Sequence, residues 1–337
     1  FILTVYGPGS SFFYLISTIG HDPQTCIWIG LLMNIISILF FCYSIFSRYP
    51  SNFSLTFTYF GLSFLFFLTL DKTTISLFQI HHDLPTLFYL FAFVFIISSA
   101  KPSSFLLFIS FLVLWMSAWT KLVALPWCLL PLAVRLLSPR ACPFLNEFTL
   151  KKTTLYLVCS GVVLLTFFGF LYGFRDLYIH LFEATKGYPW RACLSLFGSS
   201  GENLIENNTT SKFIALIRIF NLYFIEYWWL LLSCSLIFLH QLKLKKPNFF
   251  LIWLPLAYFL VLPTCLAALA KFGGVENSLL FAHLPAYGVL FLKSATIVER
   301  EFSSSWHRLV PVFLFTVLLS LISFRRSKAC EKDTSQS

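Results

Sequence analysis

The sequence predicts an all-α protein, a polytopic bundle of about ten transmembrane helices with its functional loops on the outer face of the membrane. Composition gives the first two reasons. Of the 337 residues, 58% are hydrophobic and only 11% are charged, whereas soluble domains carry about 25% charged residues. The mean hydropathy is +0.80, and 42 residues are Phe, more rings than a soluble protein can hide from water.

The third reason is the recurrence of apolar runs near the length of about 20 residues that a helix needs to cross the hydrocarbon. They predict spans at about 25–46, 53–70, 84–99, 103–119, 122–137, 153–173, 223–240, 249–269, 278–292 and 309–324. Several of these runs contain a proline, namely Pro126, Pro131, Pro255, Pro263 and Pro285. Helix bundles tolerate such kinks because neighbouring groups satisfy the freed carbonyls.

The basic residues predict the orientation of the bundle. The net charge of +10 does not indicate nucleic acid as a partner, because the basic residues form short clusters between apolar runs, as topology signals do. Residues 1–22 are placed on one face and the spans alternate from there. The opposite face then holds Arg48, Lys101, Arg135, Arg140, Lys151, Lys152, Lys243, Lys245, Lys246, Lys293, Arg300 and Arg308. The short loops of the first face hold only Lys72, Lys121 and Lys271. The first face is therefore expected to be the outer one.

The chain is expected to form one transmembrane domain at 1–324, with a long outer-face loop at 174–222 and a disordered polar tail at 325–337. The basic residues of the tail argue against an outer location, so its side stays open. The nine cysteines lie in apolar runs without a C-x-x-C pair and are expected to be small buried hydrophobes. The chain begins at Phe1 without a signal-peptide pattern, and we expect an N-terminal segment with at least one more helix before it.

Asp83 is the first candidate for chemistry. It follows His81 and His82 and precedes Leu84-Pro85 and a long apolar run. An aspartate there suits the start of a helix, where its carboxylate faces free N–H groups. It also suits an acid that contacts an acceptor or a catalytic partner, and the two interpretations are compatible. The two histidines with Asp83 also leave a metal site open, although adjacent histidines point in different directions.

Lys121 is the second candidate, because it lies between two apolar runs. A charge at membrane depth costs about 2.5–3.5 kcal/mol on insertion scales. One interpretation is a lysine that extends to the membrane surface along its apolar stem. The other is a cation that binds a lipid phosphate.

The segment 271–277, Lys-Phe-Gly-Gly-Val-Glu-Asn, is the third candidate. Its two glycines allow a sharp turn or a close approach to a ligand, and Lys271, Glu276 and Asn277 supply a cation, an acceptor and an amide. The alternative is an ordinary loop between helices, with Asn277 as the N-cap. His283, in the next apolar run, is either a satisfied polar group of the bundle or a site residue.

Four of these pieces, in this order, resemble the GT-C membrane glycosyltransferases that use polyprenyl-phosphate sugars. The most similar branch contains the protein O-mannosyltransferases and the bacterial aminoarabinose transferase of lipid A. Tyr6-Gly7-Pro8 before Phe12-Phe13-Tyr14 resembles the Y-x-P loop, and His82-Asp83-Leu84-Pro85 resembles the second acidic position. The run from Trp119 through Thr120-Lys121 to Pro126 resembles the "L-T-K" segment, and 271–277 resembles a late luminal motif.

The resemblance implies a reaction and a role for each residue. An acceptor hydroxyl attacks the anomeric carbon of a polyprenyl-phosphate sugar, and a carboxylate takes the proton. Lys121, and with it Lys271, would bind the donor phosphate and stabilise the charge that develops on it. Asp83 would position the acceptor or the base, and Tyr6, Glu276, Asn277 and His283 would line the substrate. The family's main acid precedes the Y-x-P loop, whereas no acid precedes Asp22. We therefore expect residues 1–337 alone to be inactive.

The expected partners are a polyprenyl-phosphate sugar, a lipid, glycan or protein acceptor and the membrane lipids, without nucleic acid. No cofactor is implied with certainty, and a divalent metal stays open. The bacterial inner membrane is the expected location, although an endoplasmic reticulum membrane would preserve every topological argument. Two other functions remain open: a multi-pass transporter or lipid flippase, and a non-catalytic assembly subunit. A transporter would place ionisable residues near the bilayer midplane and often carry a structural repeat. A non-catalytic subunit would not need Asp83 or Lys121.

Overall fold

The computed structural model describes residues 8–20, 22–46, 61, 83–99, 101–179, 183, 190–192, 203–204, 209–271 and 276–301. This part of the chain is almost entirely helical. The long helices are α2 (Pro23–Phe46), α5 (Asp83–Ser99), α6 (Ser104–Thr120), α9 (Leu150–Tyr172), α12 (Thr209–Lys243), α13 (Phe249–Leu269) and α14 (Leu280–Glu301). An eighth apolar segment joins the 3₁₀ helix η2 (Leu122–Leu129) to α7 (Leu130–Leu137).

Short elements complete the described fold. They are α1 (Gly9–Phe13), η1 (Tyr14–Ile19), η3 (Pro139–Ala141), α8 (Pro143–Asn146), α10 (Phe174–Tyr178) and η5 (Glu276–Leu279). The strands β1 (Arg191–Ala192) and β2 (Asn203–Leu204) pair antiparallel, with Arg191 opposite Leu204. The all-α prediction therefore holds for the described residues apart from this small hairpin.

Five of the described helices, α2, α9, α12, α13 and α14, are long and apolar enough to cross a membrane. The predicted spans 84–99, 103–119 and 122–137 coincide with the shorter apolar helices α5, α6 and η2–α7. Apart from residue 61, the predicted spans 53–70 and 309–324 lie outside the described residues, as do Tyr6, the two histidines before Asp83 and the polar tail.

Local sequence explains where several of these helices begin and end. The side chains of Ser103, Thr149 and Asn248 accept hydrogen bonds from the first free amides of α6, α9 and α13, as N-cap residues do. Gly173 separates α9 from α10 with a φ of +86°, a conformation that glycine adopts without steric cost. Pro126 and Pro131 remove two amide donors, which agrees with the 3₁₀ start of the η2–α7 segment.

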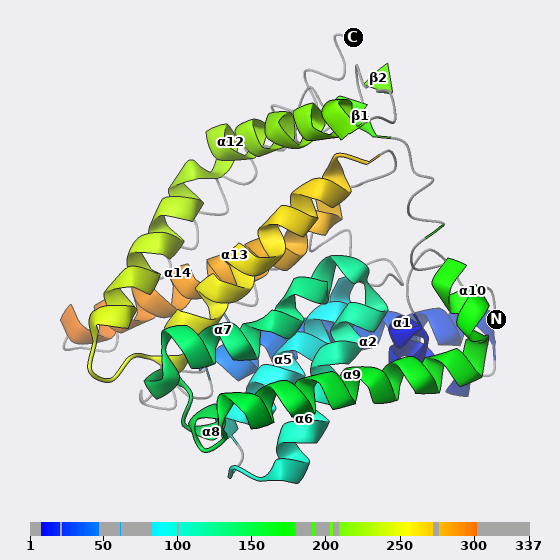
Figure 1. The fold of residues 1–337 in the computed structure, drawn as a ribbon, viewed down its shortest axis with the longest axis horizontal. Coiled ribbons are helices and arrows are strands. Elements are labelled where there is room, and N and C mark those ends of the chain that lie inside the picture. The colour runs from blue at the N-terminus through cyan, green and yellow to red at the C-terminus, as the bar shows by residue number, and fades with distance from the viewer. Residues whose placement is uncertain are drawn as a thin grey trace.

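Helix α12 differs from the prediction. Residues 209–222 were expected to belong to the long outer-face loop, but the helix begins at Thr209. Lys212, Arg218 and Asn221 make this stretch look like a loop, although apolar residues fill the positions between them. Tyr227 has non-helical angles (φ −126°, ψ 19°) and kinks the helix. Figure 1 shows the first half of α12 crossing above the bundle and the second half descending along it.

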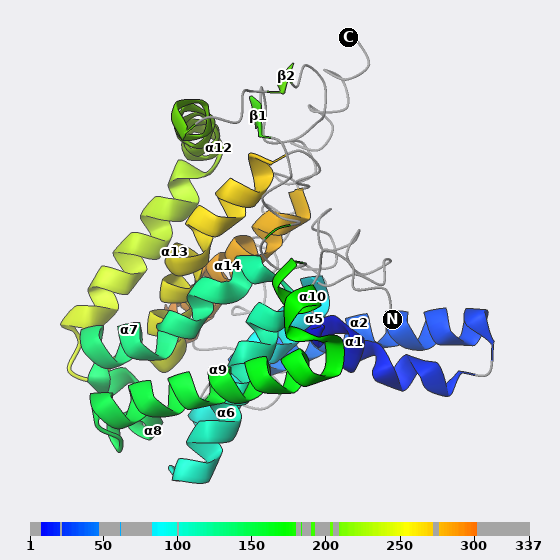
Figure 2. The same cartoon turned by 45° about the vertical axis from the view of Figure 1, so that its right-hand side comes forward.

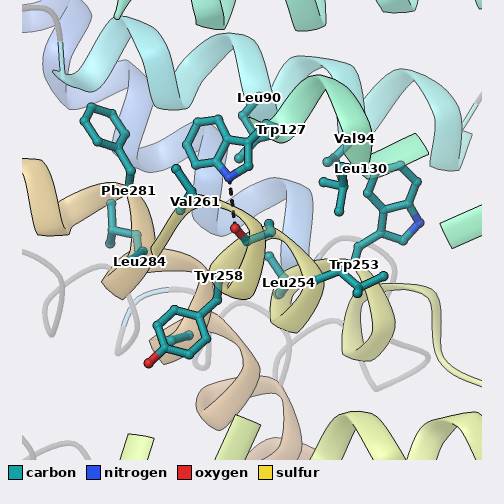
Figure 3. Packing of buried hydrophobic residues seen from close by; sticks show 14 of the residues in the cluster. Leu90, Val94, Trp127, Leu130, Trp253, Leu254, Tyr258, Val261, Phe281 and Leu284 are labelled. Atoms are coloured by element: carbon teal, nitrogen blue, oxygen red, sulfur yellow. Dashed lines mark hydrogen bonds between the residues drawn. The ribbon is translucent and has the colours of Figure 1, made fainter. Parts of the chain in front are cut away.

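The core lies where α13 and α14 pack together between the other helices. In the apolar stretches of these two helices 72% is buried, whereas only 22% is buried in those of α9 and α12, as expected for helices that face lipid. In Figures 1 and 2, α12 and α9 flank the pair from opposite sides. In Figure 3, the Trp127 indole points at the backbone carbonyl of Ala257 and donates a hydrogen bond of 3.1 Å to it.

Candidate functional site

A buried ion pair joins the two charged residues that the sequence singles out. Lys121 Nζ lies 2.6 Å from Asp83 Oδ1 and donates a hydrogen bond to it. The Asp83 side chain is fully buried, and that of Lys121 is 10% exposed. Lys121 therefore turns into the bundle and does not extend to the surface. Asp83 is the first residue of α5, in agreement with its expected place at a helix start.

The backbone places the two charges at complementary helix ends. Helices α5 and α6 pack against each other. Lys121 follows the last turn of α6 with an extended backbone (φ −149°, ψ 119°), while its N–H still bonds to the Ser117 carbonyl. The carboxylate thus lies at the positive end of α5 and the ammonium at the negative end of α6, so both helix dipoles stabilise the pair. Lys121 Nζ also lies 5.0 Å from the ring centroid of Phe281 on α14, within cation–π range.

Contacts between helix ends show which elements share the end of the bundle at Lys121. The start of α14 lies there through Phe281, and so does the last third of α13, because Thr264 Oγ1 donates to the Val123 carbonyl over 2.8 Å. The amide of Ala124 in turn bonds to the Lys121 carbonyl. We call this end of the bundle the Lys121 end. Its assignment to the outer side of a membrane stays a prediction.

The short helix α1 covers the last turn of α6. Gly9 packs directly on this turn, and its carbonyl accepts a hydrogen bond of 3.2 Å from Tyr89 Oη on α5. Phe12 extends to the ring of Phe168 near the end of α9. The chain that follows the Tyr6-Gly7-Pro8 motif therefore packs on the last turn of α6, at Thr120, which directly precedes Lys121.

Gly9 admits no side chain in this position. A Cβ there would meet Thr120 Oγ1 and would lie 2.9 Å from the Met116 carbonyl oxygen and 3.0 Å from the Thr120 amide nitrogen. Gly9→Ala is therefore expected to lower the free energy of unfolding by about 1–3 kcal/mol and to expose 8–20 to proteases. The measurement is limited proteolysis together with unfolding in detergent. Thr18→Ala, at an exposed position of η1, is the control, and equal behaviour of the two variants would contradict the packing.

Trp119 adds a polar group to the Lys121 end. Its ring packs on Phe168 with centroids 5.2 Å apart. The indole N–H is buried and has no hydrogen-bond partner among the described residues. A buried donor without an acceptor costs about 1–3 kcal/mol, so an oxygen of a water or a ligand would be stabilised there.

Lys271 lies just beyond α13, in an antiparallel bridge with Trp190. Its Nζ is 5.8 Å from the Trp190 ring. Burial lowers the pKa of Lys271, and the nearby charge of Lys212 at the start of α12 lowers it further. Glu276 and Asn277 are the first two residues of η5, so the backbone places them one turn ahead of α14.

His283 belongs to a separate cluster between α12, α13 and α14. Its Nε2 lies 3.2 Å from Tyr223 Oη, which lies 3.0 Å from Tyr258 Oη. The ring of Tyr227, at the kink of α12, lies 4.5 Å from the imidazole. Phe281 and His283 are two positions apart on α14, so they leave the helix in opposite directions. The structure therefore holds the His283 side chain among buried phenols.

Sequence reasoning missed several residues of these clusters. Phe281, Trp190, Tyr223 and Tyr258 are aromatic residues in apolar surroundings, and nothing in a sequence so rich in aromatics distinguishes them. Lys212 could have been recognised from the sequence, because it is a charged residue at the start of an apolar run. Among the described residues, no group of three His, Cys, Asp or Glu side chains could hold a metal ion. The proposed ligands His81 and His82 lie outside the described residues.

No protein-family model, no curated protein and no solved structure matches the chain.

Proposed function

We propose that the chain is a membrane glycosyltransferase of the GT-C type. It would transfer a sugar from a polyprenyl phosphate to a lipid, glycan or protein acceptor at the outer face of a membrane. We propose the bacterial inner membrane as this membrane. The described helices, with the spans expected at 53–70 and 309–324, would make the bundle of about ten helices. The observation that carries the proposal is the buried Asp83–Lys121 pair at one end of the bundle.

The position of the ion pair favours a functional site over an interaction that only stabilises the fold. Burying two charges costs several kcal/mol per ion, which their attraction repays only with good geometry. Ionisable residues inside membrane bundles accordingly mark functional sites by default. The pair also lies at helix ends and not midway along a helix, where a transporter would place it. These features favour chemistry at a membrane surface over transport.

The contacts of Asp83 and Lys121 suggest a separate role for each residue in the transfer reaction. The acceptor oxygen forms a bond to the anomeric carbon while the bond from that carbon to the phosphate oxygen breaks. The proton of the acceptor passes to a carboxylate. Lys121 would stabilise the negative charge that develops on the leaving phosphate. Asp83 already accepts a hydrogen bond from Lys121, which suits it to orient the ammonium and the acceptor.

The other predicted residues take supporting roles in this proposal. Lys271 would supply a second cation to the phosphate, and Tyr6, Glu276 and Asn277 would contact the sugar or the acceptor. His283 would line the site only indirectly, through α14, because its side chain contacts the tyrosines.

The test is sugar transfer in membranes that contain the complete gene product, with labelled polyprenyl-phosphate sugars and with or without a chelator. Lys121→Ala is expected to lower the rate by about 10²–10³-fold, the cost of losing one group that stabilises a developing oxyanion. Asp83→Asn is expected to reduce it similarly, by misplacing Lys121.

Lys243→Gln, at the exposed last turn of α12, is the matched control and should transfer like the parent. Absence of transfer with every donor, in well-expressed and folded protein, would contradict the proposal and favour a transporter. Transfer that survives both substitutions would remove Asp83 and Lys121 from the site.

A further inference from the structure

Basic residues gather where α7, α8 and α9 meet. Between residues 130 and 155 the sequence has a single acid, Glu147, and four basic residues, namely Arg135, Arg140, Lys151 and Lys152. Helix α8 contacts both α7 and η3, and α7 contacts α9. Figures 1 and 2 both show the end of α7, α8 and the start of α9 together at one end of the bundle. We call the four basic residues at this end the basic surface.

The basic surface lies at the end of α9 that is remote from the candidate site. Near the other end of this helix, Phe168 packs on Trp119, two residues before Lys121. At 1.5 Å per residue, about 25 Å separate Lys151 from Phe168 along α9. This distance is close to the thickness of the hydrocarbon, about 30 Å. The basic surface therefore lies at the headgroup level of the leaflet opposite the Lys121 end.

Contacts with Phe148 hold two of the four cations in place. Arg135 donates from Nε to the Phe148 carbonyl over 3.3 Å and from Nη1 to Asn146 Oδ1 over 2.7 Å. Lys152 Nζ lies 5.2 Å from the centroid of the Phe148 ring and 5.9 Å from that of Tyr156, within cation–π range. The rings position the ammonium without using its three hydrogen-bond donors.

Lys151 and Lys152 can both donate to an anion. Within the part of the chain that the structure describes, neither side chain takes part in an ion pair or a hydrogen bond. Lys151 is exposed and shares one helical face with Leu155, Val158 and Val162, which are exposed as well. A lipid with an anionic headgroup fits this pattern, because its phosphate meets the ammonium groups while its acyl chains cover the apolar residues.

We propose that the basic surface binds anionic phospholipids of this leaflet, with Lys151 and Lys152 contacting the headgroup phosphate. Orienting the helices requires only that positive charges be present on this side of the membrane. The fixed position of Lys152 and the apolar face beside Lys151 go beyond that requirement and favour a bound lipid. The inference does not depend on sugar transfer, because none of these residues belongs to the proposed transferase site.

The test uses photoactivatable phosphatidylglycerol at low content in phosphatidylcholine nanodiscs that hold the full chain. Crosslinking to α9 is expected to exceed that of photoactivatable phosphatidylcholine at the same content. Lys151→Gln and Lys152→Gln should each reduce it about fivefold, the equivalent of about 1 kcal/mol per lysine near an anionic surface, and the double variant about 25-fold. Lys152→Arg should retain binding because the cation remains. Glu147→Gln should increase crosslinking, because it removes the acid beside the two lysines.

Lys243→Gln is the matched control, since it removes the same charge from the last turn of α12 at the same end of the bundle (Figures 1 and 2). It should bind like the parent. Lys151→Gln should unfold like the parent, because Lys151 is exposed. The proposal fails if the double variant crosslinks like the parent, if Lys243→Gln loses as much, or if the two lipid probes crosslink equally. Soluble glycerol phosphate at millimolar concentration should not compete, and full competition would overturn the lipid assignment in favour of a free phosphate.

Discussion

Asp83→Asn is expected to lower the free energy of unfolding by about 3–5 kcal/mol, because Lys121 then stays buried without the carboxylate that it contacts. Lys121→Met should cost a similar amount by leaving Asp83 buried in its turn. The double variant Asp83→Asn/Lys121→Met should recover most of the loss, since it removes both charges together. The measurement is reversible unfolding in mixed micelles, analysed as a double-mutant cycle.

The cycle separates stability from function. If the pair serves only to hold α5 to α6, the double variant should be both stable and active. If the pair serves the proposed transfer reaction, the double variant should be stable and inactive. Single variants that unfold within about 1 kcal/mol of the parent would contradict the burial of the pair, because an exposed ion pair contributes only that much. Lys243→Gln, at an exposed site, sets the baseline for losing a charge.

The sequence predicts the helices of this fold better than their contacts. The length of an apolar run is set by the membrane and can be read locally, so α9 and α13 begin and end within about three residues of their predicted spans. The start of α12 escaped prediction because Lys212 and Arg218 interrupt an apolar pattern that is otherwise helical. The kink at Tyr227 also escaped, since the residue that breaks the helix is neither proline nor glycine.

The sequence predicts which charged residues belong to the candidate site, but it does not predict that they pair with each other. Asp83 and Lys121 stand out because charges are rare and costly in such runs. Their contact across 38 positions depends on how α5 packs against α6, which no local pattern encodes. The place of His283 among tyrosines depends likewise on the packing of α12.

Trp127→Ala is expected to be as costly as breaking the ion pair, about 3–5 kcal/mol, the usual loss for truncating a buried tryptophan. Its side chain is fully buried. Its ring lies 5.8 Å from that of Phe281, the ring under Lys121. Its indole N–H bonds to the Ala257 carbonyl (Figure 3). Trp127→Phe removes the hydrogen bond and keeps most of the volume, so it should cost only about 1–2 kcal/mol.

Truncating Trp127 is also expected to affect the Asp83–Lys121 ion pair, because Phe281 contacts both Trp127 and Lys121. With Trp127 absent, Phe281 loses a neighbour and can move away from Lys121, so the ammonium should react faster with an amine reagent in Trp127→Ala than in Trp127→Phe. Unfolding in mixed micelles and labelling of Lys121, quantified by mass spectrometry, measure the two effects. Trp228→Ala, at an exposed position on α12, should change neither. Equal stability of Trp127→Ala and Trp228→Ala would show that the η2 segment does not anchor α13. Unchanged labelling with reduced stability would show that Phe281 does not hold Lys121 in place.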